Sequence, residues 1–141
     1  MQRLQSTKAL AIVFFASGIF DLGGGFYYSF LVGMGRSIES PPTHPFYAIV
    51  IASFLFCFAY LQLLSAFNIR RYLLIIGSVI ISRIFYAVLL FAYMFFVTDF
   101  PTTFLPTAIL DLAWTIIYIV LTLINDQVRF RDLFLPYRGD S

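Results

Sequence analysis

Residues 72–97 read YLLIIGSVIISRIFYAVLLFAYMFFV, an apolar run that carries a single charge, Arg83. A helix of about 20 residues, rising 1.5 Å per residue, crosses the ~30 Å hydrocarbon core of a bilayer. We therefore predict that this run is a transmembrane helix.

Three further runs of the same kind accompany it, at about residues 9–33, 46–67 and 103–124. The chain is 61% hydrophobic and 11% charged, whereas soluble domains average about 45–50% apolar and about 25% charged residues. We predict an all-α, polytopic membrane protein whose single domain, residues 1–141, is an antiparallel bundle of four transmembrane helices with a short C-terminal tail at 126–141. The first run follows Met1–Lys8 in the manner of a signal peptide, but it continues past Asp21 to Gly35, so we expect it to remain as a span.

The connections between the runs indicate how the helices alternate in direction. Gly35–Pro45 contains three prolines, which exclude a helix and favour an extended loop. Asn68–Arg71 is short enough to be a tight turn between two antiparallel helices, and Thr98–Thr102 is similarly short.

The distribution of lysine and arginine predicts the orientation, because cytoplasmic loops carry the excess of both. One side of the predicted membrane has Arg36 alone. The other side has seven basic residues, namely Arg3, Lys8, Arg70, Arg71, Arg129, Arg131 and Arg138. Both termini are therefore expected in the cytoplasm.

Three ionisable side chains fall inside the predicted spans: Asp21, Arg83 and Asp111. Each costs about 2.5–3.5 kcal/mol at the centre of a transmembrane helix. Counted from the cytoplasmic ends of their spans, all three lie at a depth of roughly 17–20 Å, near the middle of the bilayer. Because opposite charges at one depth can pair, we predict that they form a charge cluster inside the bundle.

Polar and aromatic residues recur at helical spacing beside these charges and predict a polar bundle interior. The polar faces are Ser17, Asp21 and Tyr28; Ser53, Cys57 and Tyr60; Arg83, Tyr86 and Tyr93; and Asp111, Thr115, Tyr118, Thr122 and Asn125. The predicted ligand-binding or charge-cluster residues are Asp21, Arg83, Asp111, Tyr28, Tyr60, Tyr86, Trp114 and Tyr118. An alternative interpretation is that the charges only hold the helices in register.

The chain lacks the residues that several functional classes need. Cys57 is the only cysteine and His44 the only histidine, so a disulfide within the chain and haem ligation by two histidines are excluded. We predict no catalytic residues, no metal site and no cofactor. The net charge of +2 and the scattered arginines do not suggest nucleic-acid binding.

The last two-thirds of the chain resembles the small bacterial four-helix membrane proteins of the DoxX-like type. The residues that carry this resemblance are the dibasic turn Asn68-Ile69-Arg70-Arg71, Arg83 within the third span, and the stretch Asp-Leu-Ala-Trp at residues 111–114. The resemblance implies a four-helix bundle in a prokaryotic inner membrane and assigns no activity.

Three functions are compatible with these features. The favoured hypothesis is a non-enzymatic binding protein, or an accessory subunit of a larger membrane complex, whose charge cluster and tyrosines hold a small amphipathic molecule or a lipid. The second is a proton-coupled transporter, working as a homo-oligomer, with Asp21 or Asp111 as the proton carrier. It is less favoured because Arg83 would stay paired with that carboxylate. The third is an intramembrane isomerase or hydrolase, for which the sequence offers acid-base groups but no nucleophile arrangement.

Overall fold

The computed structural model describes residues 3–36, 44–98, 104–125 and 128–135, and their regular structure is entirely helical. The elements are α1 (Arg3–Phe26), a π-helix η1 (Tyr27–Val32), α2 (Pro45–Phe67), α3 (Leu73–Phe96), α4 (Leu105–Leu123) and a 3₁₀-helix η3 (Phe130–Leu133). Four helices are long and apolar enough to cross a membrane: Thr7–Val32, Pro45–Phe67, Leu73–Phe96 and Leu105–Leu123. The predicted helical fold class is thus confirmed, and the four predicted spans agree with the observed helices to within a few residues.

The outer surfaces of these helices are strongly apolar. Phe67, Phe95 and Phe96 are each at least 80% exposed, and many other large hydrophobic side chains also point outward. An apolar surface of this extent is what a bilayer would cover and water would not.

The closest helix pair is α1 with α2, and small residues allow it. A Cβ atom added to Gly18 would lie 2.9 Å from Cγ of Leu63, and one added to Gly25 would lie 2.8 Å from Cε1 of Phe56. On the facing side of α2, Ala52 and Ala59 are buried at the same seven-residue spacing. Glycine and alanine in this pattern let two helix backbones approach closely.

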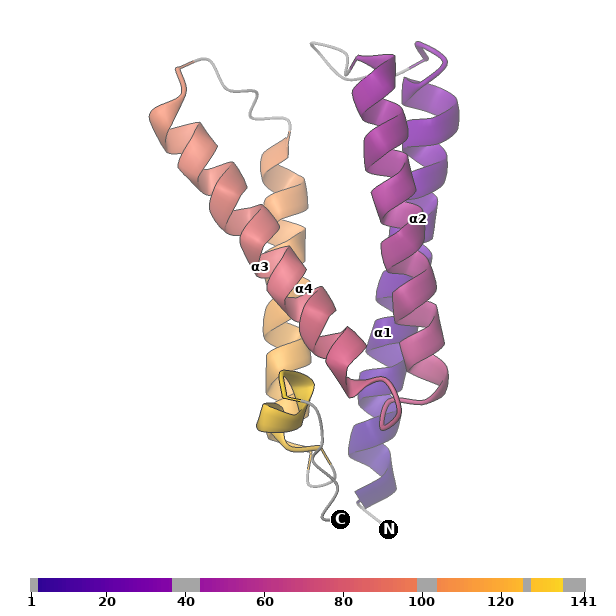
Figure 1. The fold of residues 1–141 in the computed structure, drawn as a ribbon, viewed down its shortest axis with the longest axis vertical. Coiled ribbons are helices and arrows are strands. Elements are labelled where there is room, and N and C mark those ends of the chain that lie inside the picture. The colour runs from indigo at the N-terminus through magenta and orange to yellow at the C-terminus, as the bar shows by residue number, and fades with distance from the viewer. Residues whose placement is uncertain (1–2, 37–43, 99–103, 126–127, 136–141) are drawn as a thin grey trace.

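The four helices form two hairpins, α1–α2 and α3–α4, that converge at one end of the molecule (Figure 1). The first turn of α1, residues 128–135 and the turn between α2 and α3 lie at this converging end, called the terminal end below, and the hairpins lie apart at the other. At the converging end the structure has its apolar core, which includes Leu10, Phe14, Ile76, Ile80 and Tyr118. The bundle is therefore closed at the terminal end and splayed at the opposite end.

The first span changes its helical form in the splayed half. The three glycines Gly23–Gly25 do not interrupt the helix, because α1 continues through them to Phe26. The change comes at Tyr27, where η1 begins, and the amide of Gly33 donates to the carbonyl of Tyr28 at 2.9 Å, five residues earlier. Short π-helical turns often occur at functional sites.

The described part of the tail, 128–135, turns back onto the bundle (Figure 1). Val128 and Leu133 are buried in the apolar core of the terminal end. The amide of Arg71 donates to the carbonyl of Asn68, consistent with the predicted turn between α2 and α3. Residues 37–43 of the proline-containing loop and 99–102 of the third connection lie outside the described residues.

Candidate functional site

Arg83 of α3 forms ion pairs with two aspartates from different helices. Its Nη2 lies 2.6 Å from Oδ2 of Asp21 on α1, and its Nη1 contacts Oδ1 of Asp111 on α4. The side chains of Arg83 and Asp21 are only 7% and 6% exposed. These three residues, called the charge cluster below, connect α3 to helices of both hairpins.

A glutamine from α2 completes the network, so that all four long helices contribute to it. Nε2 of Gln62 donates to Oδ2 of Asp21 at 2.5 Å, and its Oε1 accepts from the hydroxyl of Tyr118 at 3.3 Å. The hydroxyl of Ser17 donates to Oε1 of Gln62 and accepts from Nη2 of Arg83 at 3.0 Å. Gln62 and Ser17 are both fully buried.

Helical spacing explains how the chain brings these groups together. Ser17 and Asp21 are four residues apart on α1, and Asp111 and Tyr118 are seven apart on α4, so each pair shares one helix face. The close approach of α1 to α2 at Gly18 then brings Gln62 against that face of α1. The network thus depends on the same small-residue packing that holds the first hairpin together.

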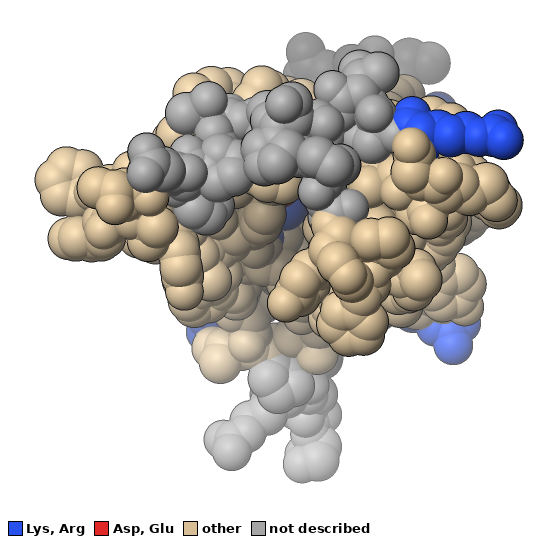
Figure 2. Space-filling model, turned by 90° about the horizontal axis from the view of Figure 1, so that it is seen from above, with Lys and Arg blue, Asp and Glu red and all other residues tan. Residues whose placement is uncertain are grey.

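A groove with a volume of about 1100 Å³ lies on the splayed side of the charge cluster. It is lined by the later part of α1, the start of η1, and parts of α2, α3 and α4, and its lining includes Asp21, Arg83 and Asp111. The remaining lining is mainly apolar and aromatic. Seen from the splayed end, the molecule is hollowed between its helices, with basic atoms visible at depth (Figure 2). The groove therefore has apolar walls and a charged inner end.

Aromatic rings in contact close the bundle on the terminal side of the cluster. The ring centroids of Phe14 and Tyr118 are 4.4 Å apart, and those of Trp114 and Tyr118 are 6.2 Å apart. Tyr118 is fully buried. The groove ends at the cluster, because this packing fills the bundle behind it.

The predicted site residues fall into three groups. Asp21, Arg83 and Asp111 are in contact, and Tyr28 and Tyr86 line the groove with them. Trp114 and Tyr118 lie behind the cluster in the closed half and not in the groove lining. Tyr60 is 65% exposed on the outside of the bundle, so its expected place beside the ligand is wrong.

The polar face expected for α2 is also wrong, and the physical reason is its packing against α1. Ser53, Cys57 and Tyr60 all point outward, while the inner face carries small residues and Gln62. The sequence analysis did not select Gln62, because the helical spacing of the three outward residues indicated that their face was the polar inner one. The signal that identifies the inner face is the buried set Ala48, Ala52, Ala59, Gln62 and Ser65.

Three buried donors near the cluster have no hydrogen-bond partner among the described residues: Nε of Arg83, Nε1 of Trp114 and Oγ1 of Thr115. Groups of this kind are usually satisfied by internal water. They are enclosed by packing, and Trp114 and Thr115 do not line the groove. They are therefore not contact points for a molecule in the groove.

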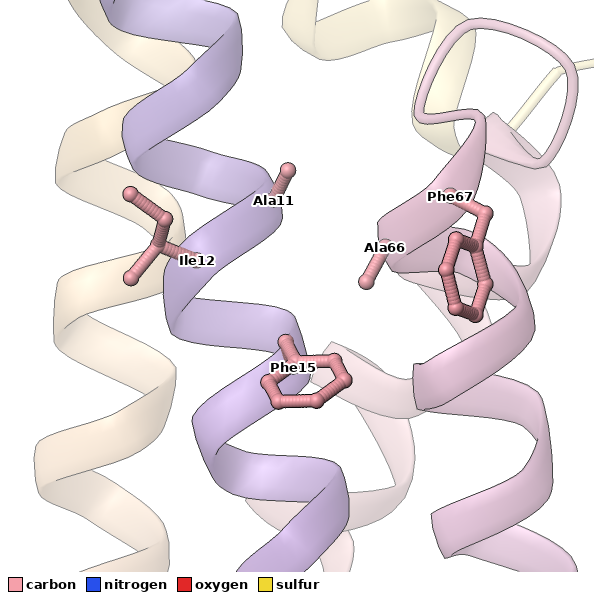
Figure 3. A pocket seen from close by; sticks show the side chains of 5 residues that line it. All are labelled: Ala11, Ile12, Phe15, Ala66 and Phe67. Carbon is pink, nitrogen blue, oxygen red and sulfur yellow. The ribbon is translucent and has the colours of Figure 1, made fainter.

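A second, smaller pocket of about 240 Å³ lies between α1 and α2 near the terminal end. It is lined by Ala11, Ile12, Phe15, Ala66 and Phe67 (Figure 3). All five side chains are apolar, so this pocket offers no group for chemistry or for polar recognition.

Comparison with known proteins assigns no relative to the chain. No protein-family model, no curated protein and no solved structure matches it. The functional interpretation therefore depends on the geometry of the groove and the cluster.

Proposed function

We propose that this protein is a membrane-spanning binding protein, or an accessory subunit of a membrane complex, that holds a small amphipathic molecule or a lipid in the groove. The observation that carries the proposal is an apolar groove of about 1100 Å³ whose inner end is the charge cluster. Sites for small molecules typically measure about 300–1000 Å³ and combine apolar walls with a few polar groups. The walls of the groove would contact the apolar body of the ligand, and the charge cluster would bind its polar head group.

The position of the groove supports a ligand that comes from the bilayer. If the four long helices cross the membrane, the groove lies at the depth of one leaflet, and the cluster lies near the midplane. Intramembrane ionisable residues are by default candidates for function, because burying them is costly. The bacterial inner membrane implied by the DoxX-like resemblance is the proposed location.

Native mass spectrometry of the protein purified from its own membranes tests this proposal. Gly23 lines the groove, and a Cβ atom added to it would meet nothing within 4 Å. Gly23→Leu should therefore fill part of the groove without disturbing the helices. The outward-facing Ile116, 60% exposed, provides the matched control, Ile116→Phe.

We expect a co-purifying small molecule or lipid on the unmodified protein and on Ile116→Phe, and its loss from Gly23→Leu. Retention of the same molecule by Gly23→Leu would contradict binding in the groove. A protein that carries no molecule, and gains no thermal stability from added membrane lipids, would contradict the binding function itself.

One observation keeps the transporter as the second candidate: Asp111 reaches the groove and is a carboxylate that a proton could neutralise. A carrier needs this group to take up and release a proton during each cycle. The test is the flux of a cationic substrate into proteoliposomes under an imposed pH gradient. If this flux follows the gradient and Asp111→Asn abolishes it, the protein is a proton-coupled transporter and not a binding protein. We expect no such flux.

A further inference from the structure

The charge cluster is not electrically balanced. Arg83 supplies one positive charge to two carboxylates, Asp21 and Asp111, which leaves a formal charge of −1. Among the described residues that line the groove, Arg83 is the one basic side chain. An isolated charge in a region of low dielectric constant is costly, so the surplus favours a positive partner.

The two aspartates differ in their hydrogen bonds and in their exposure, and this difference indicates which of them carries the surplus negative charge. Asp21 accepts hydrogen bonds from both Arg83 and Gln62 and is 6% exposed at its side chain. For Asp111 the described residues supply a hydrogen bond from Arg83, and its side chain is 19% exposed. Asp21 is thus the enclosed counter-ion, and Asp111 is the carboxylate that presents negative charge to the groove.

The walls around Asp111 suit an organic cation. A positively charged nitrogen over the face of an aromatic ring gains about 0.5–2 kcal/mol. The aromatic side chains of the lining come from the first three spans and from the residue that precedes α4, and they include Tyr27, Tyr28, Phe54, Phe58, Tyr86 and Phe104. In addition, the hydroxyls of Tyr86 and Thr107, hydrogen-bonded to each other at 2.8 Å, lie about one helical turn from Arg83 and Asp111 and can accept from an ammonium group.

An inorganic cation fits the same groove poorly. Metal ions need several oxygen, nitrogen or sulfur ligands. The described residues contain no group of three or more His, Cys, Asp or Glu side chains that could hold one. Aromatic walls replace the water shell of a metal ion badly, whereas the apolar part of an organic amine gains from them.

We infer that the groove takes an amphipathic amine, with its cationic nitrogen on the carboxylate of Asp111 and its apolar body between the aromatic walls. This inference rests on the proposed function and specifies the charge of its ligand.

A matched set of probes tests the sign of that charge. We would use 4-phenylbutylamine, which is cationic at neutral pH, with 4-phenylbutanol as the neutral match and 4-phenylbutyrate as the anionic match. The protein would be held in nanodiscs of phosphatidylcholine, whose zwitterionic surface does not concentrate cations. Trp114 is the only tryptophan and lies three residues from Asp111 on α4, so its fluorescence reports on the cluster.

We expect the amine to bind at least about tenfold more tightly than the alcohol, the ratio that one charge-assisted hydrogen bond typically gives, and the carboxylate to bind most weakly. Asp111→Asn should remove the preference for the amine and leave the binding of the alcohol unchanged. Tyr60→Phe, on the outside of the bundle, should leave all three affinities unchanged.

The outcomes separate the two proposals. Equal affinity of the unmodified protein for the amine and the alcohol would overturn the inferred positive charge of the ligand and leave the binding function in place. This comparison does not depend on the folding of any variant. Tighter binding of the carboxylate would overturn it as well. If none of the probes binds, and native mass spectrometry shows no co-purifying molecule, the binding function fails together with the inference.

Discussion

Arg83 is the residue on which the cluster depends, because it donates to both aspartates and is only 6% exposed. Replacing it with alanine leaves the buried Asp21 and the partly exposed Asp111 without a positive partner. We expect Arg83→Ala to lower the free energy of unfolding by about 3–5 kcal/mol, the usual cost of removing one partner of a buried ion pair. The measurement is thermal unfolding in detergent, with the exposed Arg36→Ala as control.

A triple variant separates the stranded charges from the lost packing. In Arg83→Leu with Asp21→Asn and Asp111→Asn, no charge remains in the cluster, so much of the lost stability should return. If Arg83→Ala unfolds at the same temperature as the unmodified protein, the ion pairs contribute no net stability. If the triple variant is less stable than Arg83→Ala, packing, not charge, accounts for the loss.

At the residue scale, the sequence predicts the depth of the charged residues better than it predicts which face of each helix points into the bundle. Three ionisable residues in apolar runs are conspicuous, and counting residues along each span places them at one depth. The face that each helix turns inward depends on its partner. On α2 the spacing of Ser53, Cys57 and Tyr60 predicted a polar inner face, but the fit of Ala52 and Ala59 against α1 turns that face outward.

Among the elements, the four long helices were predictable and two short ones were not. An apolar run of about 20 residues specifies a helix almost by itself, since a bilayer leaves no water to bond the backbone. The π-helix η1 at Tyr27–Val32 and the docked 3₁₀-helix η3 depend on tertiary contacts. The sequence predicts only a short C-terminal tail at 126–141, whereas Leu133 of this tail is buried against α3.

Gly77 of α3 has no side chain, and this lets η3 pack closely against α3. A Cβ atom at this position would overlap the carbonyl oxygen of Leu133. We expect Gly77→Ala to displace residues 128–135 and to cost about 1–3 kcal/mol, as overpacking typically does. Hydrogen exchange measured by mass spectrometry should show faster exchange in this segment.

The matched control for Gly77 is Gly23→Ala, where the added methyl group meets open space. It should leave exchange at residues 128–135 unchanged and should stabilise α1 slightly, because alanine is the better helix former. Unchanged exchange in Gly77→Ala would show that the tail does not depend on this close approach.

The whole molecule combines a closed half with an open half. The terminal end, where the two hairpins converge (Figure 1), holds the apolar core and the docked tail. The opposite half contains the groove. The charge cluster lies at the boundary and binds the two hairpins together through Arg83. A ligand seated on the cluster would contact both hairpins, so binding would be sensitive to how far the hairpins are apart.

The closed end is also the basic end, which predicts the orientation of the whole molecule. The start of α1, residues 128–135 and the turn between α2 and α3 lie at this end (Figure 1). That turn contains Arg70 and Arg71, whereas Arg36 follows η1 at the opposite end of the first span. Because cytoplasmic segments carry the excess of lysine and arginine, the closed end should face the cytoplasm and the groove should open toward the outer leaflet.

Single cysteines in a Cys57→Ala background test this orientation. Met34, Thr98 and Asn68 are exposed and lie at helix ends. Cysteines at Met34 and Thr98 should react with an impermeant thiol reagent added to intact cells, and a cysteine at Asn68 should react only after the membrane is permeabilised. The unsubstituted Cys57→Ala protein is the control for background labelling. Labelling at Asn68 in intact cells, with no labelling at Met34, would invert the orientation and turn the groove toward the cytoplasmic leaflet, so that any amine it binds would have to come from inside the cell.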